Sequence, residues 1–335
     1  MQFGEEREEF FQRHTGLERM PCPRTLLNIL RVINPSRLEL CLYGILRNVF
    51  GREQRPKEWQ VCIDGKTVRS TATISDYEKP LHIITVLLAD YCITLGQISV
   101  NDKSNEIPAV RELLDLMDIK GAVVTLDAMH CQKDTVEKII TNKADYVVQL
   151  KANQGSFYED VYAMFDEKYM DEADTDCEYE TFETLEKGHG RIEKRVCYVL
   201  RDIAYFTDYL AAWSGLKKIF AVKRTVTKDG KTSKEISCYL SSVNASAEKL
   251  LSYTRKHWQI ESFHWILDVN FGEDNSKIRD KNAQICLNIM RKFGITVLKK
   301  YIENHPVKRK TIVANMRKCL LNPDYLEDVL TYFCE

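Results

Sequence analysis

The sequence lacks the long apolar segments that membrane insertion and export require. Its 335 residues contain no apolar run of about 18 residues, the length at which a transmembrane helix is expected. The N-terminal stretch MQFGEEREEFFQRH is charged and has no apolar core of the kind found in signal peptides. We therefore expect no membrane partner and a cytoplasmic location.

Cysteine spacing excludes two common ways of stabilising a small domain. The 11 Cys residues are scattered, and no C-x-x-C pair or other zinc-type or disulfide-type spacing occurs. We expect reduced thiols that pack as small hydrophobic side chains. Internal repeats and low-complexity segments are also missing. A hydrophobic content of 44% and a charged content of 29% are ordinary for a globular protein with one large or two modest domains.

The formal net charge of −1 hides a strong asymmetry. Residues 159–186 contain 12 acidic residues and one basic residue, whereas residues 277–318 contain 12 basic and two acidic residues. The basic block is a candidate surface for phosphate groups, and a solvated helix face is the alternative interpretation. The acidic block argues against indiscriminate binding of polyanions by the whole molecule.

The chain begins with helical patterns and then changes to short apolar runs. Residues 1–50 are predicted to be helical, with Ser36 as the N-cap of the second helix, and Pro56 marks a linker. Strands are expected at 59–65, 82–90, 92–100, 122–127 and 145–150, with 82–100 as a hairpin. Helices are expected at 104–117, capped by Ser104 or Asn105, and at 131–143. This order predicts a mixed α/β core rather than repeated βαβ units.

The second half of the chain begins with a different sequence pattern. Residues 175–243 contain strand-like runs, with a turn at Lys228-Asp229-Gly230, and are interpreted as a β-rich insertion. Helical periodicity resumes near Ala247 and continues to the end, interrupted at Pro306 and Pro323. We therefore predict a helical N-terminal region at 1–56 and a catalytic domain at 57–335 that carries the insertion.

The most informative segment is RKHWQIESFHWILD, residues 255–268. At about 100° per residue, one helical arc of roughly 100° collects acidic and aromatic side chains. These are His257, Trp258, Glu261, Trp265 and Asp268. The opposite side carries Ile260, Phe263, Ile266 and Leu267. One face is therefore expected to pack in the core, while the other presents a carboxylate in an aromatic setting.

Two further carboxylates precede this helix. Asp64 and Asp127 each follow a hydrophobic strand directly, at the rim of a sheet where ligands bind. If the strands are neighbours, the two carboxylates repel unless a cation offsets their charge. Mg²⁺ takes oxygen ligands and bridges to phosphate, and Glu261 would supply the third ligand. Taken singly, Asp64 is also a turn residue, Asp127 a helix cap and Glu261 a surface residue.

Five ordered segments resemble one family. They are IDGKTVR, VVTLDAMHCQ, YVVQLKANQ, EKGHGRIEKR and RKHWQIESFHWILDVNFGEDNSKIR. Together they resemble the H-repeat-associated DDE transposases of insertion sequences, over roughly residues 17–330. The resemblance implies an RNase H-like catalytic core with a β-rich insertion before the catalytic Glu, and helical parts at both ends. It also implies a bacterial, nucleoid-associated protein.

The resemblance assigns roles to particular residues. Asp64, Asp127 and Glu261 would bind two Mg²⁺ ions, for which Mn²⁺ may substitute, and would catalyse DNA cleavage and strand transfer. The expected DNA contacts are His130, Gln132, Lys151, Asn153, Gln154, His189, Arg191, His257, Trp258, Trp265, Arg279 and Arg291. For each His, a core or turn hydrogen bond is the alternative. For the two Trp, packing around the catalytic helix is favoured over stacking on a flipped base.

The chain departs from the wider superfamily at two points. Relatives there often carry Tyr, Arg and Lys around the catalytic Glu, whereas this chain has His257 four residues before it and Asp268 seven after it. Family members also usually have a longer helical leader, so we expect a truncated N-terminus. The predicted substrates are the element's terminal inverted repeats and target DNA, bound by a homodimer. The alternatives are a catalytically inactive DNA-binding relic and a stand-alone RNase H-like nuclease.

Overall fold

The computed structural model describes residues 7–50, 59–71, 80–100, 106–166, 178–188 and 190–332. The strands are β1 (Trp59–Thr67), β2 (His82–Leu88), β3 (Ile93–Val100), β4 (Ala122–Leu126), β5 (Asp145–Leu150), β6 (Tyr179–Gly188), β7 (Arg191–Leu200), β8 (Lys218–Lys228) and β9 (Lys231–Ser241). The helices are α2 (Glu8–Thr15), α3 (Pro23–Val32), α4 (Pro35–Phe50), α5 (Glu106–Leu116), α6 (Lys133–Thr141), α7 (Ser156–Phe165), α9 (Thr207–Leu210), α10 (Ala247–Val269), α11 (Lys281–Asn304), α12 (Ile312–Leu321) and α13 (Pro323–Thr331). Short 3-10 turns follow several strands: η1 (Arg69–Thr71), η3 (Ala128–His130), η4 (Ala152–Gln154) and η5 (Ala204–Phe206).

All described strands belong to one mixed sheet. The strand order is β3-β2-β1-β4-β5-β9-β8-β7-β6. Strand β2 is antiparallel to both β1 and β3, whereas β4 lies parallel to both β1 and β5. The four later strands continue the sheet through β9, which pairs with β5. The expected mixed α/β class is therefore confirmed.

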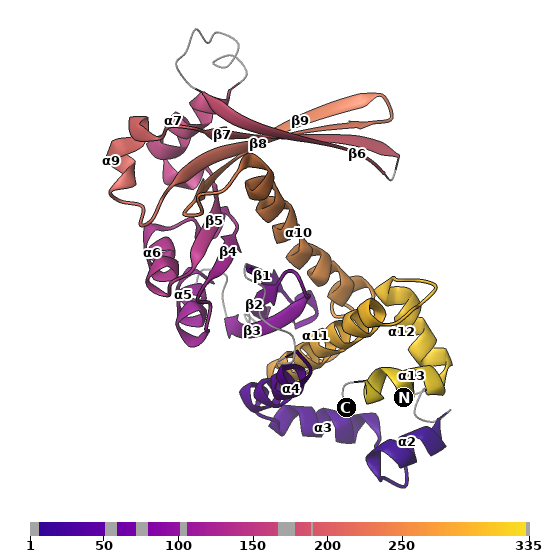
Figure 1. Cartoon of the computed structure of the whole chain (residues 1–335). Helices are drawn as coiled ribbons and strands as arrows, with labels where there is room; N and C mark the ends of the chain where they lie inside the picture. The colour runs from indigo at the N-terminus through magenta and orange to yellow at the C-terminus, as the bar shows by residue number, and fades with distance from the viewer. Residues whose placement is uncertain are drawn as a thin grey trace.

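Helices cover the two faces of the sheet differently. On one face, Val61 and Ile63 of β1 pack in a cluster with side chains of α5, α6 and α7. On the other face, α10 crosses the sheet from β6 and β7 to β1, as Figure 1 shows. Its residues Ile260, Phe263 and Leu267 pack with α11 and with the outward side of β1 and β2. Each strand thus alternates its side chains between an α5-α7 face and an α10 face.

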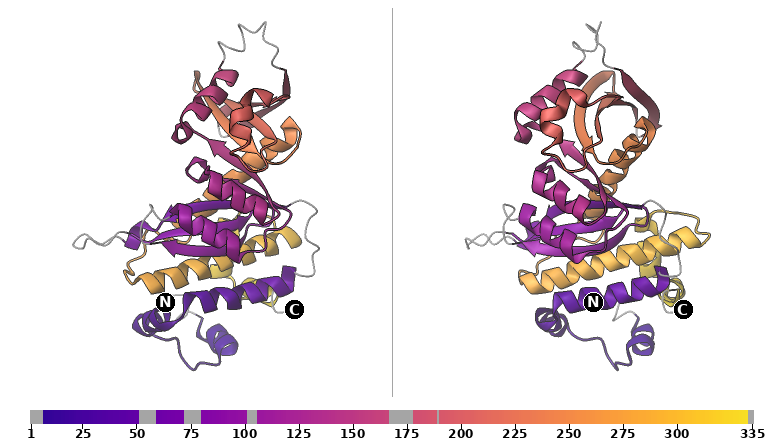
Figure 2. Two further views of the ribbon diagram at one scale, coloured as in Figure 1. Left: turned by 90° about the vertical axis from the view of Figure 1, so that its left-hand side faces the viewer. Right: turned by 60° about the vertical axis from the view of Figure 1, so that its left-hand side comes forward.

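The N-terminal and C-terminal helices form an outer layer. Both α3 and α4 contact α11, and α12 and α13 pack on the same helix. In both views of Figure 2, α11 runs between the sheet and the N-terminal helices. No helix within the described ranges is both long and apolar enough to cross a membrane.

Several local predictions are confirmed. The β2-β3 hairpin forms as expected. The turn between β8 and β9 consists of Asp229 and Gly230, which both have positive φ, as a two-residue type I′ hairpin turn requires. Strands β6 to β9 fill the segment that was expected to be β-rich. Helix α11 ends before Pro306, and Pro323 begins α13.

Other local predictions are wrong. The N-cap before α4 is Asn34, whose side chain accepts a hydrogen bond from the Arg37 backbone N–H at 3.0 Å, and not Ser36. Strand β1 continues to Thr67, so Asp64 lies inside the strand. The helical pattern also breaks between Val269 and Lys281, where no proline occurs. The expected linker at Pro56 and the caps Ser104 and Asn105 lie outside the described residues.

Candidate active site

Two acidic residues lie side by side on the α10 face of the sheet. Because β1 and β4 are parallel neighbours with Ile63 opposite Leu126, the next residues, Asp64 within β1 and Asp127 just past the end of β4, lie next to each other. Both side chains are partly open, with 24% of Asp64 and 45% of Asp127 exposed. The condition under which these two acids were expected to lie close together, that their strands are neighbours, is therefore met.

Helix α10 places Glu261 above this pair of aspartates. The His257 ring is within 3.0 Å of the hydroxyl of Thr125, which precedes Asp127 by two residues on β4. Seven residues, or about two turns, further along, His264 Nδ1 is 3.4 Å from Asp64 Oδ2 on β1. Glu261 lies between these two histidines on the same side of the helix, since residues three and four apart share a face. The two histidine contacts therefore hold Glu261 over the gap between the aspartates.

The pKa values of Glu261 and Asp64 reflect this arrangement. Burial raises the pKa of Glu261, and the negative charges of Asp64 and Asp127 raise it further. Burial would also raise the pKa of Asp64, but the hydrogen bond and charge of His264 outweigh burial and leave it below the usual value. The two aspartates each lie within 4.0 Å of a histidine ring nitrogen, of His264 for Asp64 and of His130 for Asp127.

This donor set suits a hard divalent cation. Three carboxylates offer only oxygen ligands, which Mg²⁺ and Mn²⁺ prefer. Within the part of the chain that the structure describes, no three His, Cys, Asp or Glu side chains are already arranged so that they could hold a metal ion. Mg²⁺ in phosphate chemistry usually keeps waters and completes its shell with substrate oxygens, so an open set of carboxylates fits this ion.

The turn after Asp127 is braced from the next strand. The Asp127 carboxylate caps η3 by accepting a hydrogen bond from the Met129 backbone N–H at 3.2 Å. Asn153 donates to the Ala128 carbonyl at 2.9 Å, and Gln154 donates to the Cys131 carbonyl at 2.6 Å. Gln132 donates to the carbonyl of Met129 at 3.3 Å. These three amide side chains therefore support the backbone around Asp127.

His130 lies behind the site, in the layer covered by α5. Its ring is fully buried, and Nε2 is 3.0 Å from Glu106 Oε1. The other Glu106 oxygen is 2.7 Å from Nε2 of His82, and Nδ1 of His82 is 3.0 Å from the Thr67 hydroxyl. Burial would raise the pKa of Glu106, but hydrogen bonds from both histidines lower it to about 2. The position of His130 therefore matches the alternative interpretation, a hydrogen bond in the core, and not the expected DNA contact.

The two tryptophans of α10 are open to solvent. Trp258 is 59% exposed and Trp265 is 57% exposed. Neither ring is buried in the core, to which this part of α10 contributes Ile260, Phe263 and Leu267. The interpretation that the rings pack around the helix stays a prediction. Both indole rings flank Glu261 on an exposed face, where they are available to a ligand.

The expected basic contacts are distributed unevenly. Lys151 is exposed next to η4, and Arg191 is 44% exposed and 3.3 Å from Glu193. Arg279 donates to the Ser70 carbonyl, and the largely buried Arg291 is 3.9 Å from Glu273. His189 lies outside the described residues.

The basic block at 277–318 is only partly a surface. Lys292 and Lys300, both in α11, are 2% and 3% exposed. The Lys292 ammonium donates to the hydroxyl of Thr85 at 2.8 Å and to the amide oxygen of Gln97 at 2.6 Å. Part of the positive charge of this block thus lies inside the protein and does not face a polyanion.

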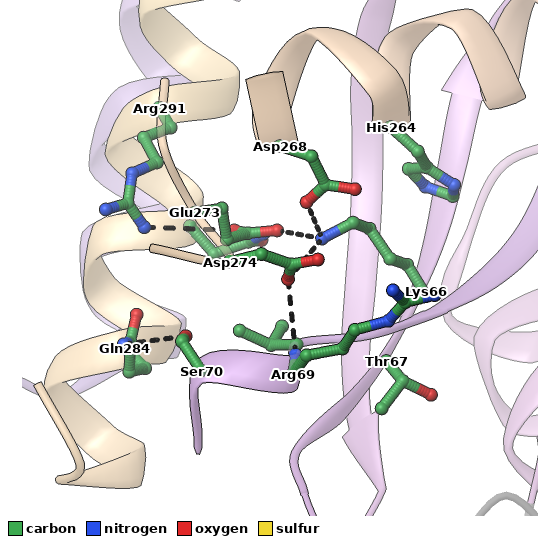
Figure 3. Close-up of polar contacts among 12 residues, drawn as sticks. Lys66, Thr67, Arg69, Ser70, His264, Asp268, Glu273, Asp274, Gln284 and Arg291 are labelled. Atoms are coloured by element: carbon green, nitrogen blue, oxygen red, sulfur yellow. Dashed lines mark hydrogen bonds and ion pairs between the residues drawn. The ribbon is translucent and has the colours of Figure 1, made fainter. Parts of the chain in front are cut away.

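Sequence reasoning missed the residues that support the site. His264 follows Glu261 by three residues, and this helical spacing was the signal for its contact with Asp64. Lys66 follows Asp64 by two residues, so the alternation of a strand places both side chains on the α10 face. Lys66 forms ion pairs with Asp268 and Glu273, as Figure 3 shows. The partners of Lys66 had no local signal because they lie about 200 residues away.

Comparison with known proteins gives a consistent result. Residues 55–298 match the family described as "Transposase DDE domain". The chain is 33% identical over 334 residues to "H repeat-associated putative transposase YhhI" of Escherichia coli K12, covering 98% of this chain and 85% of that one. It is 36% identical over 276 residues to "Putative transposase YncI" of Escherichia coli O157:H7, covering 81% of this chain and 68% of that one. A solved piggyBac transposase complex with hairpin DNA aligns with 90% of this chain and 60% of its own, at 8% identity and a TM-score of 0.41, too weakly to add to the argument.

Proposed function

The chain belongs to the DDE transposase family, and we propose that it cleaves DNA at the ends of an insertion sequence and joins those ends to target DNA. The observation that carries this proposal is the convergence of three acids from β1, the β4 edge and α10. The proposed core is RNase H-like, and the proposed substrates are the terminal inverted repeats and the target duplex. A homodimer would hold the two ends.

Each acid has a distinct proposed role in holding the reacting groups. Asp64 in β1 and Asp127 just past β4 would hold a divalent ion at the place where the scissile phosphate would bind. Glu261 comes from the opposite layer and would complete the set from the far side. Mg²⁺, when bound, supplies activation of the attacking oxygen and stabilisation of the leaving oxygen.

The pKa of Glu261 supports a cation at this point. Burial and, after it, the charges of the two aspartates destabilise its carboxylate, so a bound divalent ion would offset effects that otherwise favour the protonated acid. Asp127 and Glu261 are exposed enough for their side chains to rotate toward an ion when a phosphate group enters. His264 would orient Asp64 by keeping one of its oxygens engaged.

We further propose that the exposed face around Glu261 contacts DNA. Trp258 and Trp265 offer flat aromatic surfaces on which an unpaired base can stack. Lys151 and Arg191 are the exposed basic candidates among the predicted contacts. Asn153, Gln154 and His130 would act indirectly, by fixing the turn that carries Asp127.

The decisive experiment compares nicking by single variants. A supercoiled plasmid that carries the inverted repeats bracketing the gene is incubated with protein and Mg²⁺. We expect Asp64→Asn, Asp127→Asn and Glu261→Gln to abolish nicking while the circular dichroism spectrum stays unchanged. Asp115→Asn is the matched control, because this acid is 50% exposed and pairs with Lys138 away from the site. Nicking by any triad variant at the wild-type rate contradicts the assignment.

The same material separates the alternatives. A gel shift with and without Mg²⁺ detects binding, and product analysis detects cleavage and joining. Binding without cleavage by the wild-type chain identifies the inactive relic, although the three acids being present and close together favours the active form. Cleavage without strand transfer identifies a stand-alone nuclease.

A further inference from the structure

A buried lysine lies two residues beyond the first proposed metal ligand. Lys66 follows Asp64 on β1, and its side chain points to the same α10 face. Only 10% of this side chain is exposed. Its ammonium group is 2.6 Å from Asp268 Oδ1, 3.8 Å from Asp274 Oδ1, and hydrogen-bonded to Glu273 (Figure 3). One cation on the strand is thus surrounded by three acids from the end of α10 and the loop after it.

The acids around Lys66 are themselves fixed in place. Glu273 has no exposed side-chain surface and accepts a hydrogen bond from Asn288 on α11 at 2.7 Å. Asp274 accepts a hydrogen bond from the backbone N–H of Arg69 at 3.2 Å. The segment that follows Asp64 is therefore joined to the segment that follows α10 by side-chain and backbone contacts.

A second set of contacts ties the same two segments together. Arg279 donates to the Ser70 carbonyl, and Gln284 Nε2 is 3.3 Å from the Ser70 hydroxyl. Figure 3 shows the Ser70 contact beside the Lys66 cluster. The connection thus extends from β1 through η1, which makes the strand and the loop after α10 one rigid unit.

The charge of Lys66 is already compensated by this cluster. Burial would lower its pKa, but the negative charges of Glu273 and Asp268 and hydrogen bonds to both raise it, so the ammonium stays charged. Because three other carboxylates lie within 4 Å of this ammonium group, they and not Asp64 are its counter-ions. Lys66 therefore acts on the catalytic acids by fixing the positions of the segments that carry them, and not by neutralising their charge.

The position of the cluster sets the distance between two of the catalytic acids. Asp268 follows Glu261 by seven residues, which is two turns, or about 10 Å, along a straight helix. An α-helix transmits a fixed end position along its length, so anchoring Asp268 to Lys66 fixes where Glu261 lies above Asp64. Side chains behind metal ligands commonly determine ligand geometry in this way.

We propose that Lys66, Asp268 and Glu273 form a positioning clamp that holds the catalytic helix in register with the strand carrying Asp64. Lys66 is a positioning residue, since it acts on the metal site through Asp64 and Glu261. This inference rests on the proposed metal-binding role of the three acids. It assigns a function to Asp268 at the position where the wider superfamily often carries a lysine.

The test measures Mn²⁺ binding by the electron paramagnetic resonance signal of free Mn²⁺, with the full chain and without turnover. The key variant is Lys66→Met/Asp268→Asn, which removes the ion pair without changing the net charge. We expect its Mn²⁺ affinity to fall by about tenfold or more, as for other groups that orient metal ligands. The conservative variant Lys66→Arg should keep most of the wild-type affinity, because arginine retains the charge that pairs with Asp268 and Glu273.

A matched control separates positioning from general loss of stability. Arg195→Met/Glu193→Gln removes a buried ion pair of 2.6 Å from β7, also without changing the net charge. It should lower the unfolding temperature but leave Mn²⁺ affinity unchanged. Wild-type affinity in the Lys66→Met/Asp268→Asn protein overturns the clamp, as does equal loss in the β7 control or in Lys66→Arg.

The outcome also distinguishes the clamp from the proposed function. If Glu261→Gln loses Mn²⁺ binding and the Lys66→Met/Asp268→Asn variant does not, the metal triad stands and the clamp fails. If Glu261→Gln binds Mn²⁺ as wild type does, the triad itself is wrong and the clamp is overturned with it. A double variant that does not fold is detected by circular dichroism, and the single variant Asp268→Asn, compared with Lys66→Arg, then decides the question.

Discussion

Replacing Gly65 with Ala tests the layer behind the two aspartates of the proposed site. Gly65 lies between Asp64 and Lys66 on β1, and its hydrogen faces α5 instead of α10. A Cβ atom there would lie only 2.7 Å from Glu106 Cδ, and the nearest atoms of His82 and Glu106 would be closer still. Since these atoms belong to a buried network, Glu106 must move and lose its contacts with His82 and His130.

The cost follows from the pKa of Glu106. Its histidine partners lower that pKa from 4.5 to about 2, and each pKa unit corresponds to about 1.4 kcal/mol, which gives about 3 kcal/mol of stabilisation. We expect Gly65→Ala to lose about this amount at pH 7, with overpacking of about 1–3 kcal/mol as a second contribution. The wild-type stabilisation is present above pH 4.5 and declines as the pH falls toward 2, because Glu106 then becomes protonated.

The assay is urea unfolding monitored by circular dichroism between pH 7 and pH 3.5. The free-energy difference between wild type and Gly65→Ala should be largest at pH 7 and should shrink below pH 4.5. Gly188→Ala is the matched control, since Gly188 is also in a strand and an added Cβ there meets nothing within 4 Å. Equal stability of Gly65→Ala and wild type refutes the reasoning, and a pH-independent difference refutes the assignment to Glu106.

Two further predictions concern a buried cation and the exposed aromatics. Burial lowers the pKa of Lys292 from 10.5 to about 7. Between these two pH values the folded state binds fewer protons than the unfolded state, so the free energy of unfolding should rise with pH by a few kcal/mol. Urea unfolding of Lys292→Met should lose this rise, whereas the surface variant Lys138→Met should keep it; an unchanged slope contradicts the burial argument. Trp258→Ala and Trp265→Ala should each weaken DNA binding by about 1–3 kcal/mol in fluorescence anisotropy without changing the unfolding midpoint. Tyr205→Ala, at 75% exposure, is the control, and no loss of affinity with either Trp variant removes the stacking role.

The parts of the fold that the sequence could predict are those set by local rules. The alternation of β2 and β3 and the positive-φ turn at Asp229 and Gly230 depend on residues adjacent in the chain. The core face of α10 follows from the spacing of Ile260, Phe263 and Leu267. These features were predicted because the residues that determine them are close together in sequence.

The missed features depend on contacts between distant segments. The end of α10 at Val269 has no proline to signal it, and the chain leaves the helix where Glu273 reaches the ammonium group of Lys66. Likewise, β1 extends past Asp64 because Gly65 to Thr67 pair with β2. A strand ending at an Asp-Gly pair was the locally favoured prediction, and tertiary pairing overrode it.

The candidate site also has features that local sequence predicts and features that depend on distant segments. Local sequence patterns pointed to Asp64, Asp127 and Glu261, but the contacts that hold α10 against β1 and β4 involve other residues. His257 contacts Thr125, His264 contacts Asp64, and Asp268 pairs with Lys66. Each contact joins α10 to a strand that lies more than 100 residues earlier in the sequence. Burial and then the charges of the two aspartates raise the pKa of Glu261, so its ionised form is unfavourable there without a cation. The contacts of its neighbours hold α10 over the aspartates against this repulsion, which the proposed divalent ion would relieve.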